Sequence, residues 1–418
     1  MCISQGLARK MRVLVISATF PPMRSGGGPF AFRLCEKLGE HGVDVHVLTS
    51  QIHNVDRSPS FQLSPLMRTW SWRELPRLLR LARQFRPDVV DLHFAGSIYH
   101  DQPMITLAPV ILRRMLPQVR LVTHIEYPEP VHIARLGRPT RAIRKVLAFW
   151  VGLRNVDYEY GSILHESDRI VILSQDHVGM LAKRVEGVAG KCVLIPPPPT
   201  IPISAEMDEG TRQREREQLQ ITKQDFVVAF YGLLYPGKGL EVLLEALQIL
   251  VQRNRPVRLL MIGGENEVFL QTWNRQGYGE ELKGLARRLG VEDRVFWSGD
   301  CPFDSDRGSR YLRLADACAL PFEKGVQLHN SSFSVAASHG LAIVTTKSAA
   351  TESAFVDGSN VLMVRPKNPD ALADRLDSLR DSPDVRRRLQ EGALQLTREW
   401  FSWDKALEQT MRVFSGEL

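Results

Sequence analysis

The feature that most constrains the fold is an alternation, found in both halves of the chain, of short β-branched runs with longer amphipathic segments. In the first half we expect strands at 11–18, 43–49, 88–94, 119–125, 169–174 and 191–196. In the second half we expect strands at 226–232, 257–264, 294–299, 317–322 and 342–346. Strands separated by helices form right-handed βαβ units, so each half is predicted to build a parallel sheet.

Two helices are clear from their periodicity. Phe30, Leu34 and Leu38 lie four residues apart on one helical face, and Gly42 is well placed to end that helix. The second helix is expected over 239–253, directly after the first strand of the second half.

A proline-rich segment, "PPPPTIPIS" at 196–204, separates the two halves. Proline neither continues a helix nor donates to a strand ladder, and 418 residues exceed what a single core usually supports. We therefore predict an α/β protein of two Rossmann-like, doubly wound domains that face a cleft, with domains at 1–198 and 199–401. Ligands of such sheets bind beyond the carboxyl ends of the strands.

Composition narrows the class of protein. A formal charge of +7 suggests an anionic partner such as a nucleotide, a phosphate or a membrane surface. The five cysteines are scattered without a C-x-x-C pair, which argues against a disulfide framework or zinc site and favours the cytoplasm. No apolar stretch is long enough to span a bilayer, so any membrane contact is expected to be peripheral. Met11 precedes the first strand and competes with Met1 as the initiator.

The loop "RSGGGPF" follows the first strand and opens a helix, so the amides at Gly26 and Gly27 can approach a diphosphate closely. A tight turn explains the glycines equally well. The loop is not G-x-G-x-x-G, and the second strand does not end in a carboxylate for a ribose, which disfavours a dehydrogenase.

His93 and His124 lie near the ends of the third and fourth expected strands. An imidazole there can orient a substrate or donate to it, although a single histidine is more often structural. The following "EYPEP" favours His124.

Lys238 stands between two glycines at the start of a helix in the second half, where an ammonium can neutralise a phosphate. The spacing is not G-x-x-x-x-G-K-[ST], so a nucleoside triphosphatase is disfavoured. The alternative is a solvated lysine in a turn.

The segment "PFEKGVQLHNSSFSVAASHG" at 321–340 leads into a short helix at Asn330, Ser331 and Ser332. These residues can simply cap the helix. Alternatively, the unpaired amides of its first turn can hold phosphate oxygens.

Two basic segments, 70–87 and 135–150, mix arginine with tryptophan and leucine. The first contains Trp70 and Trp72, and such mixtures can touch anionic lipid head groups. Surface helices that pack their leucines inward are the more common explanation.

Together these segments resemble the retaining, GT-B fold glycosyltransferases of family 4. The resemblance rests on "ISATFPPMRSGGG", "SDRIVILS", "GLLYPGKGLEVLLEAL", "GVEDRVFWSGD", "LADACALPF", "SHGLAIVTT" and "TESAFVDGSNVLMV". It implies a metal-independent hexosyltransferase without a cofactor, which moves a sugar from a nucleotide diphosphate to a glycan, lipid-linked or small-molecule acceptor in polysaccharide or glycoconjugate synthesis.

The resemblance also assigns roles. It implies a donor bound by the C-terminal domain, an acceptor bound by the N-terminal domain, and a closing helix at 402–418 that packs back on the N-terminal domain. Lys238 matches the family's phosphate-binding lysine, His124 matches the histidine that meets the donor sugar, and Gly26 and Gly27 would close over the diphosphate. No nucleic acid partner is implied.

The departures from the family pattern are as informative. Leu233 replaces the usual arginine, and Gln327 and Val335 replace the usual pair of glutamates. We expect Asn330, Ser331 and Ser332 to take over donor contacts. Two alternatives stay open: a degenerate scaffold that binds nucleotide sugars or serves as a partner subunit, and a GT-B epimerase or phosphorylase.

Overall fold

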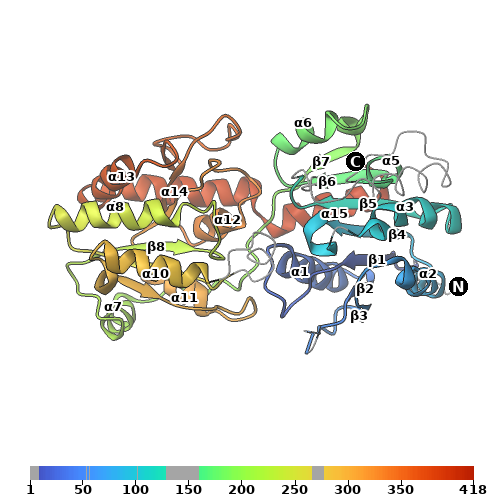
Figure 1. Ribbon diagram of the computed structural model, residues 1–418, viewed down its shortest axis with the longest axis horizontal. Coiled ribbons are helices and arrows are strands. Elements are labelled where there is room, and N and C mark those ends of the chain that lie inside the picture. Colours follow the sequence, from blue (N-terminus) through green and yellow to red (C-terminus); the bar gives the residue numbers. More distant parts are fainter. Residues whose placement is uncertain (1–8, 53, 56, 101, 129–159, 266–276) are drawn as a thin grey trace, which may run out of the picture. The chain divides into compact units, whose positions relative to one another are not determined.

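The computed structural model describes residues 9–418 except 53, 56, 101, 129–159 and 266–276 (Figure 1). The basic segment 135–150 lies outside the described residues. The chain forms two compact units. The N-terminal unit comprises Met1–Ile195 with Leu407–Leu418, and the C-terminal unit comprises Pro196–Ala406.

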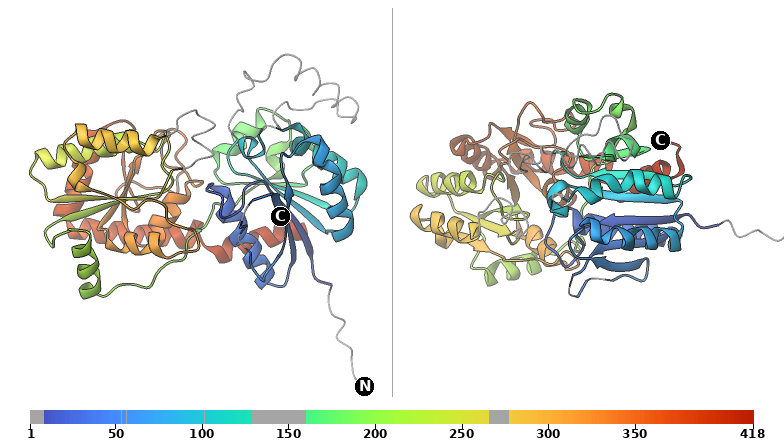
Figure 2. Two further views of the ribbon diagram at one scale, coloured as in Figure 1. Left: turned by 60° about the horizontal axis from the view of Figure 1, so that its bottom comes forward. Right: turned by 45° about the vertical axis from the view of Figure 1, so that its right-hand side comes forward.

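The N-terminal unit is built on a parallel sheet in the order β3-β2-β1-β4-β5-β6-β7. Its strands are β1 (Arg12–Ser17), β2 (Asp44–Ser50), β3 (Gln62–Met67), β4 (Val89–Phe94), β5 (Arg120–Ile125), β6 (Arg169–Ile172) and β7 (Cys192–Leu194). Its described α-helices are α1 (Gly27–Glu40), α2 (Leu75–Phe85), α3 (Pro103–Met115), α5 (Ile163–Glu166) and α6 (Asp176–Ala182). The central strands are buried along almost their whole length because helices cover both faces of the sheet (Figure 2).

The C-terminal unit repeats this plan with the order β10-β9-β8-β11-β12-β13. Its strands are β8 (Phe226–Tyr231), β9 (Val257–Ile262), β10 (Val295–Trp297), β11 (Ala317–Leu320), β12 (Ala342–Thr346) and β13 (Leu362–Val364). The helices that belong wholly to it are α7 (Glu209–Gln218), α8 (Leu240–Gln252), α10 (Tyr278–Arg288), α11 (Arg307–Leu314), α12 (Ser331–Ser338), α13 (Pro369–Asp381) and α14 (Pro383–Trp400). The prediction of two doubly wound, Rossmann-like sheets is confirmed.

Strand order places a topological switch point in each sheet. In the N-terminal unit the order reverses between β1 and β4, and in the C-terminal unit between β8 and β11. Loops that leave adjacent strands in opposite directions open a crevice at such a point, which is where doubly wound sheets bind ligands. The loops after β1, β8 and β11 are those that carry the glycines, Lys238 and Asn330.

Two strands were not predicted. β3 contains Pro65, which removes a ladder donor and hides the alternation expected of a strand. The proline is tolerated because β3 lies at the edge of its sheet. β13 also lies at a sheet edge and has only three residues, too few for a periodic pattern.

The first helix is confirmed in its main features. Leu34 and Leu38 of α1 are buried, and the helix ends at Glu40. Gly42 follows with φ +85°, a conformation that favours glycine, and its amide donates to the carbonyl of Gly39. The second predicted helix is α8, one residue shorter at each end.

In the basic segment at 70–87, one of the two tryptophans lies in the core and not at the surface. Trp70 is buried in the core, and its indole nitrogen donates to the hydroxyl of Ser50 at 2.8 Å. The expectation that Trp70 could touch lipid is therefore wrong, because its ring completes the core beneath α2. Leu78 and Leu81 of α2 also face inward. Among the described residues, no helix is both long and apolar enough to cross a membrane.

The last helix, α15 (Trp403–Ser415), carries the chain from the C-terminal unit back to the N-terminal unit. Val413 and Phe414 are buried there, and the guanidinium of Arg169 donates to the backbone oxygen of Leu418 at 2.6 Å.

Candidate functional site

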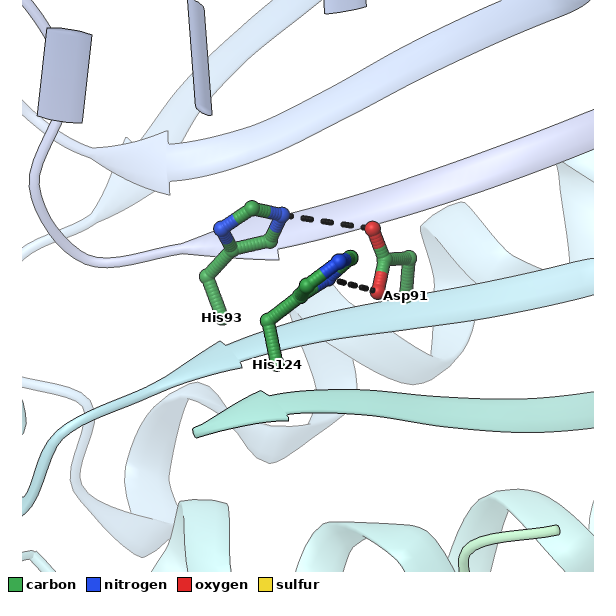
Figure 3. A group of neighbouring side chains, drawn as sticks. All are labelled: Asp91, His93 and His124. Carbon is green, nitrogen blue, oxygen red and sulfur yellow. Dashed lines mark hydrogen bonds and ion pairs between the residues drawn. The ribbon is translucent and has the colours of Figure 1, made fainter. Parts of the chain in front are cut away.

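Two imidazoles and a carboxylate share one face of the N-terminal sheet beside its switch point. Asp91 and His93 are two residues apart on β4 and so point to the same face, and His124 on β5 is the register partner of His93. Asp91 Oδ2 lies 3.2 Å from His93 Nε2, and Asp91 Oδ1 lies 2.8 Å from His124 Nδ1. Figure 3 shows both rings directed at this one carboxylate, and all three side chains are buried.

Neighbouring elements hold the two rings in place. Phe30 of α1 packs against them, with ring centroids 6.0 Å from His93 and 6.1 Å from His124. The two imidazoles lie 4.6 Å apart. Tyr99 donates its hydroxyl to the backbone oxygen of His93 at 2.8 Å, which fixes the end of β4.

The carboxylate of Asp91 is the hydrogen-bond acceptor that both rings share. Burial alone would raise the pKa of Asp91, but the facing His124 and His93 outweigh it and hold that pKa well below its ordinary range. The ionised carboxylate only accepts hydrogen bonds, so each ring nitrogen that faces it carries a hydrogen. Nδ1 of His93 and Nε2 of His124 are buried and have no hydrogen-bond partner among the described residues.

A second carboxylate, that of Glu126, lies at the N-terminus of α1. A side chain at Gly27, the first residue of α1, would overlap the Glu126 carboxyl group, so this glycine is what allows the close approach. Glu126 Oε1 is buried without a hydrogen-bond partner among the described residues. Burial raises the pKa of Glu126, while the nearby His93 acts in the opposite direction. At Gly26, in contrast, an added Cβ would have no other atom within 4 Å.

The Asp91, His93 and His124 cluster also has the ligand types of a metal site, with ligand atoms within 4.8 Å of one another. Both imidazoles, however, already direct a hydrogen at Asp91. The observed geometry is that of a carboxylate that orients two histidines.

In the C-terminal unit, Lys238 lies in the loop between β8 and α8. Only 8% of the residue is exposed, and its ammonium lies 4.9 Å from the ring centre of Tyr235 and 5.0 Å from that of Phe322. No carboxylate of the described residues forms an ion pair with it. The two ring faces attract the ammonium but leave its charge unneutralised.

Glycines bring the loops of this unit together at its switch point. Gly239 has φ +71°, and a side chain there would overlap the carbonyl of Pro321, which follows β11. Likewise, a side chain on Gly232 would overlap the hydroxyl of Ser332. The amide of Glu323 donates to the carbonyl of Gly237 at 3.0 Å. The loops that carry Lys238 and Ser332 therefore touch.

The Asn330 side chain does not cap α12. Asn330 stands at the N-cap position of α12. Its Oδ1 accepts a hydrogen bond from the backbone amide of Gln327, three residues earlier, at 2.7 Å, and not from an amide of the helix. Ser331 and Ser332 form the first turn of α12. The Gln327 side-chain amide donates to the carbonyl of Ala350 at 3.3 Å, and Val335 is buried in the core.

The residues predicted from sequence fall into two groups, one in each unit. Gly26, Gly27 and His124 gather at the N-terminal switch point, and Lys238 gathers with the loop of Asn330, Ser331 and Ser332 at the C-terminal one. Sequence reasoning missed Asp91 and Glu126. The signal for both was their spacing, since Asp91 lies two residues before His93 on β4, and Glu126 lies two residues after His124, directly beyond the end of β5.

Comparison with known proteins identifies the family of each half. The model of glycosyltransferase family 4 matches residues 24–198, and that of the glycosyl transferases group 1 matches residues 211–396.

The D-inositol 3-phosphate glycosyltransferase of Actinosynnema mirum is 28% identical over 260 residues, which cover 60% of this chain and 58% of the relative. That of Xylanimonas cellulosilytica is 30% identical over 212 residues, 50% of this chain and 46% of the relative. The chain thus spans about half the length of the curated relatives it matches.

Solved structures show the same fold at low sequence identity. A glycosyltransferase from Rickettsia africae has a TM-score of 0.71 at 13% identity and covers 98% of this chain and 99% of its own. HepE from Anabaena, solved with UDP and glucose, has a TM-score of 0.69 at 15% identity and covers 97% of this chain and 100% of its own. Each parallel-sheet unit thus matches a glycosyltransferase family model, and the chain has the GT-B fold of the solved glycosyltransferases.

Proposed function

We propose that this chain transfers a sugar from a nucleotide diphosphate donor to a hydroxyl of a glycan, lipid-linked or small-molecule acceptor, with retention at the anomeric carbon and without a metal ion. HepE, which shares the fold, was solved with UDP-glucose, and the curated relatives are named for transfer to D-inositol 3-phosphate. Cytoplasmic residence, with peripheral contact of the exposed arginines of α2 to anionic lipid, is part of the same proposal.

The observation that carries the proposal is Lys238. Lys238 is largely buried, and its ammonium has no carboxylate partner among the described residues, which suits it to bind an anion. It lies at the switch point of the C-terminal sheet, where doubly wound domains bind their ligands. The loop that carries Lys238 touches the start of α12, where Ser331 and Ser332 supply the first backbone amides of the helix. Such amides at a helix N-terminus favour phosphate oxygens.

The chemistry follows from this arrangement. As the bond between the sugar and the donor phosphate breaks, negative charge develops on the leaving diphosphate. Lys238 and the α12 amides would stabilise that charge, and a fixed donor of this kind is typically worth several kcal/mol in the transition state. A phosphate oxygen of the leaving group would then accept the proton of the attacking hydroxyl on the same face of the sugar.

The test is nucleotide binding by titration calorimetry with the full chain. We expect Lys238→Ala to weaken binding of the preferred nucleoside diphosphate by about 10- to 100-fold, because one hydrogen bond to a charged group is lost. Lys283→Ala is the matched control, since Lys283 is exposed and paired with Glu280. Binding by Lys238→Ala that equals that of the unaltered chain would contradict the proposed role.

A degenerate scaffold remains the second candidate, because a specific observation favours it. Gln327 and Val335 stand where the family pattern has glutamates. The side-chain amide of Gln327 donates to the carbonyl of Ala350, and Val335 is buried in the core. Donor binding without transfer or hydrolysis, measured as release of free nucleoside diphosphate, would establish the scaffold. Release that depends on Lys238 would establish the enzyme.

A further inference from the structure

The ammonium of Lys238 lies against two aromatic rings that come from different segments of the C-terminal unit. Its Nζ is 4.9 Å from the ring centre of Tyr235 and 5.0 Å from that of Phe322. Both distances are within the roughly 6 Å over which a ring face attracts a cation. Tyr235 lies in the same loop as Lys238, whereas Phe322 follows β11. Among the described residues, the partners of this cation are thus rings and not carboxylates.

The ring of Phe322 is held by its surroundings. Only 4% of the residue is exposed, and its backbone oxygen accepts a hydrogen bond from the hydroxyl of Thr346 on β12. The amide of the next residue, Glu323, donates to the carbonyl of Gly237, the neighbour of Lys238. The sheet and the lysine loop therefore both fix the backbone that carries this ring.

A tight turn brings the ring of Tyr235 to the same ammonium. The amide of Lys238 donates to the carbonyl of Tyr235 at 3.4 Å, which closes a β-turn over 235–238. Its second residue is Pro236, and its third is Gly237 with φ +95°. Proline and then a glycine of positive φ are typical of a type II turn, so the sequence itself determines that the first and fourth residues of this turn meet.

A ring face and a carboxylate differ in what they leave available on an ammonium. The ring attracts the positive charge through its quadrupole but does not neutralise it, so the charge stays available to an anion. A carboxylate would neutralise the charge and compete with a phosphate for the N–H donors. A lysine side chain is also flexible, and ordering it when a ligand binds lowers the affinity. Rings that order the lysine beforehand remove that cost.

We propose that Phe322 and Tyr235 are positioning residues that hold the Lys238 ammonium in place, so that a phosphate meets a cation that is already ordered. This inference rests on the proposed function in taking a nucleoside diphosphate as the anion. It gives a role to two aromatic residues that the sequence analysis did not assign to the site, and both act through Lys238.

The experiment measures binding of UDP, GDP and ADP to the full chain by titration calorimetry, and the nucleotide that binds most tightly is the probe for the variants. Phe322→Leu keeps an apolar side chain but removes the ring face. Phe226→Leu is the matched control, because Phe226 is also buried and its ring faces the guanidinium of Arg386 at 5.8 Å. Phe226 begins β8, whereas the loop of Lys238 follows the other end of that strand.

We expect Phe322→Leu and Tyr235→Leu each to weaken binding of the probe about 3- to 10-fold, because a mobile lysine must then be ordered by the anion. Tyr235→Phe, which keeps the ring, and Phe226→Leu should bind the probe like the unaltered chain. In a Lys238→Ala background, Phe322→Leu should have no further effect, because the ring has no cation left to position. A trifluorinated phenylalanine at position 322 keeps the ring but withdraws electron density from its face, so it should also weaken binding.

Four results would overturn the inference alone. The first is that Phe322→Leu binds the probe like Phe226→Leu, and the second is that the fluorinated ring leaves binding unchanged. The third is equal weakening by Phe322→Leu with and without Lys238, which would show a structural effect on the loop. The fourth is that Tyr235→Phe weakens binding as much as Tyr235→Leu, because the hydroxyl and not the ring would then act.

The proposed function is tested separately in the same series. In each of these four cases a weakened probe in Lys238→Ala leaves the proposed function standing. If Lys238→Ala binds the probe like the unaltered chain, or if none of the three nucleotides binds, the proposed function and the inference are both overturned.

Discussion

Replacement of Asp91 by asparagine tests whether one carboxylate orders the N-terminal switch point. Asp91 accepts hydrogen bonds from His93 and His124, and its depressed pKa means that these interactions outweigh the cost of burying its charge. An asparagine oxygen can accept from one ring, but its amide group then meets the N–H of the other. One hydrogen bond to a charged group is lost and two donors are opposed, so we expect a loss of about 2–4 kcal/mol.

Differential scanning calorimetry measures this loss. For a unit of about 200 residues, each kcal/mol shifts the melting temperature by roughly 2–4 °C, so Asp91→Asn should melt roughly 5–15 °C lower at pH 7. The control is Asp44→Asn, which removes a half-exposed carboxylate 3.5 Å from Arg12 and should cost about 1 kcal/mol or less.

The pH dependence of the loss follows from the depressed pKa. The stability that ionised Asp91 contributes is complete above the unfolded pKa, about 3.9, and is lost as pH falls toward the folded value. The difference between Asp91→Asn and the unaltered chain should therefore shrink below about pH 4. A variant no less stable than Asp44→Asn at pH 7 would refute the reasoning.

Two further substitutions follow from the same contacts. Gly239→Ala should cost about 2–4 kcal/mol, since it adds an overlap with the Pro321 carbonyl to the cost of φ +71°, whereas Gly237→Ala, at φ +95° with no atom within 4 Å, should cost only about 1–2 kcal/mol. Equal losses in urea unfolding would argue against the predicted overlap. Because burial raises the pKa of Glu126, Glu126→Gln should stabilise the chain by roughly 1 kcal/mol at pH 7, and this gain should disappear toward pH 4 as the native carboxyl group takes up its proton. A gain that does not change with pH in calorimetry would contradict that account.

The two sheets could be predicted because most of their strands are short runs rich in β-branched residues, separated by amphipathic helices. The loops after β1, β8 and β11 could be predicted because the carboxyl ends of strands at a switch point must meet. Glu126 could not be placed at Gly27, since this contact joins residues 99 positions apart and depends on the angle at which α1 packs on the sheet. The hydrogen-bond partner of the Asn330 side chain could not be predicted either. An asparagine at the start of a helix can accept from an amide that precedes it as readily as from an amide of the helix.

The passage of α15 back to the N-terminal unit has a consequence for how the protein is made. The first 195 residues leave the ribosome long before Leu407–Leu418, which complete the same unit. The intervening segment Pro196–Ala406 has 211 residues (406 − 195), and synthesis at about 5–20 residues per second takes roughly 10–40 s. For that interval the nascent unit exposes the apolar surface that Val413 and Phe414 later cover, which makes this surface a natural contact for chaperones during translation.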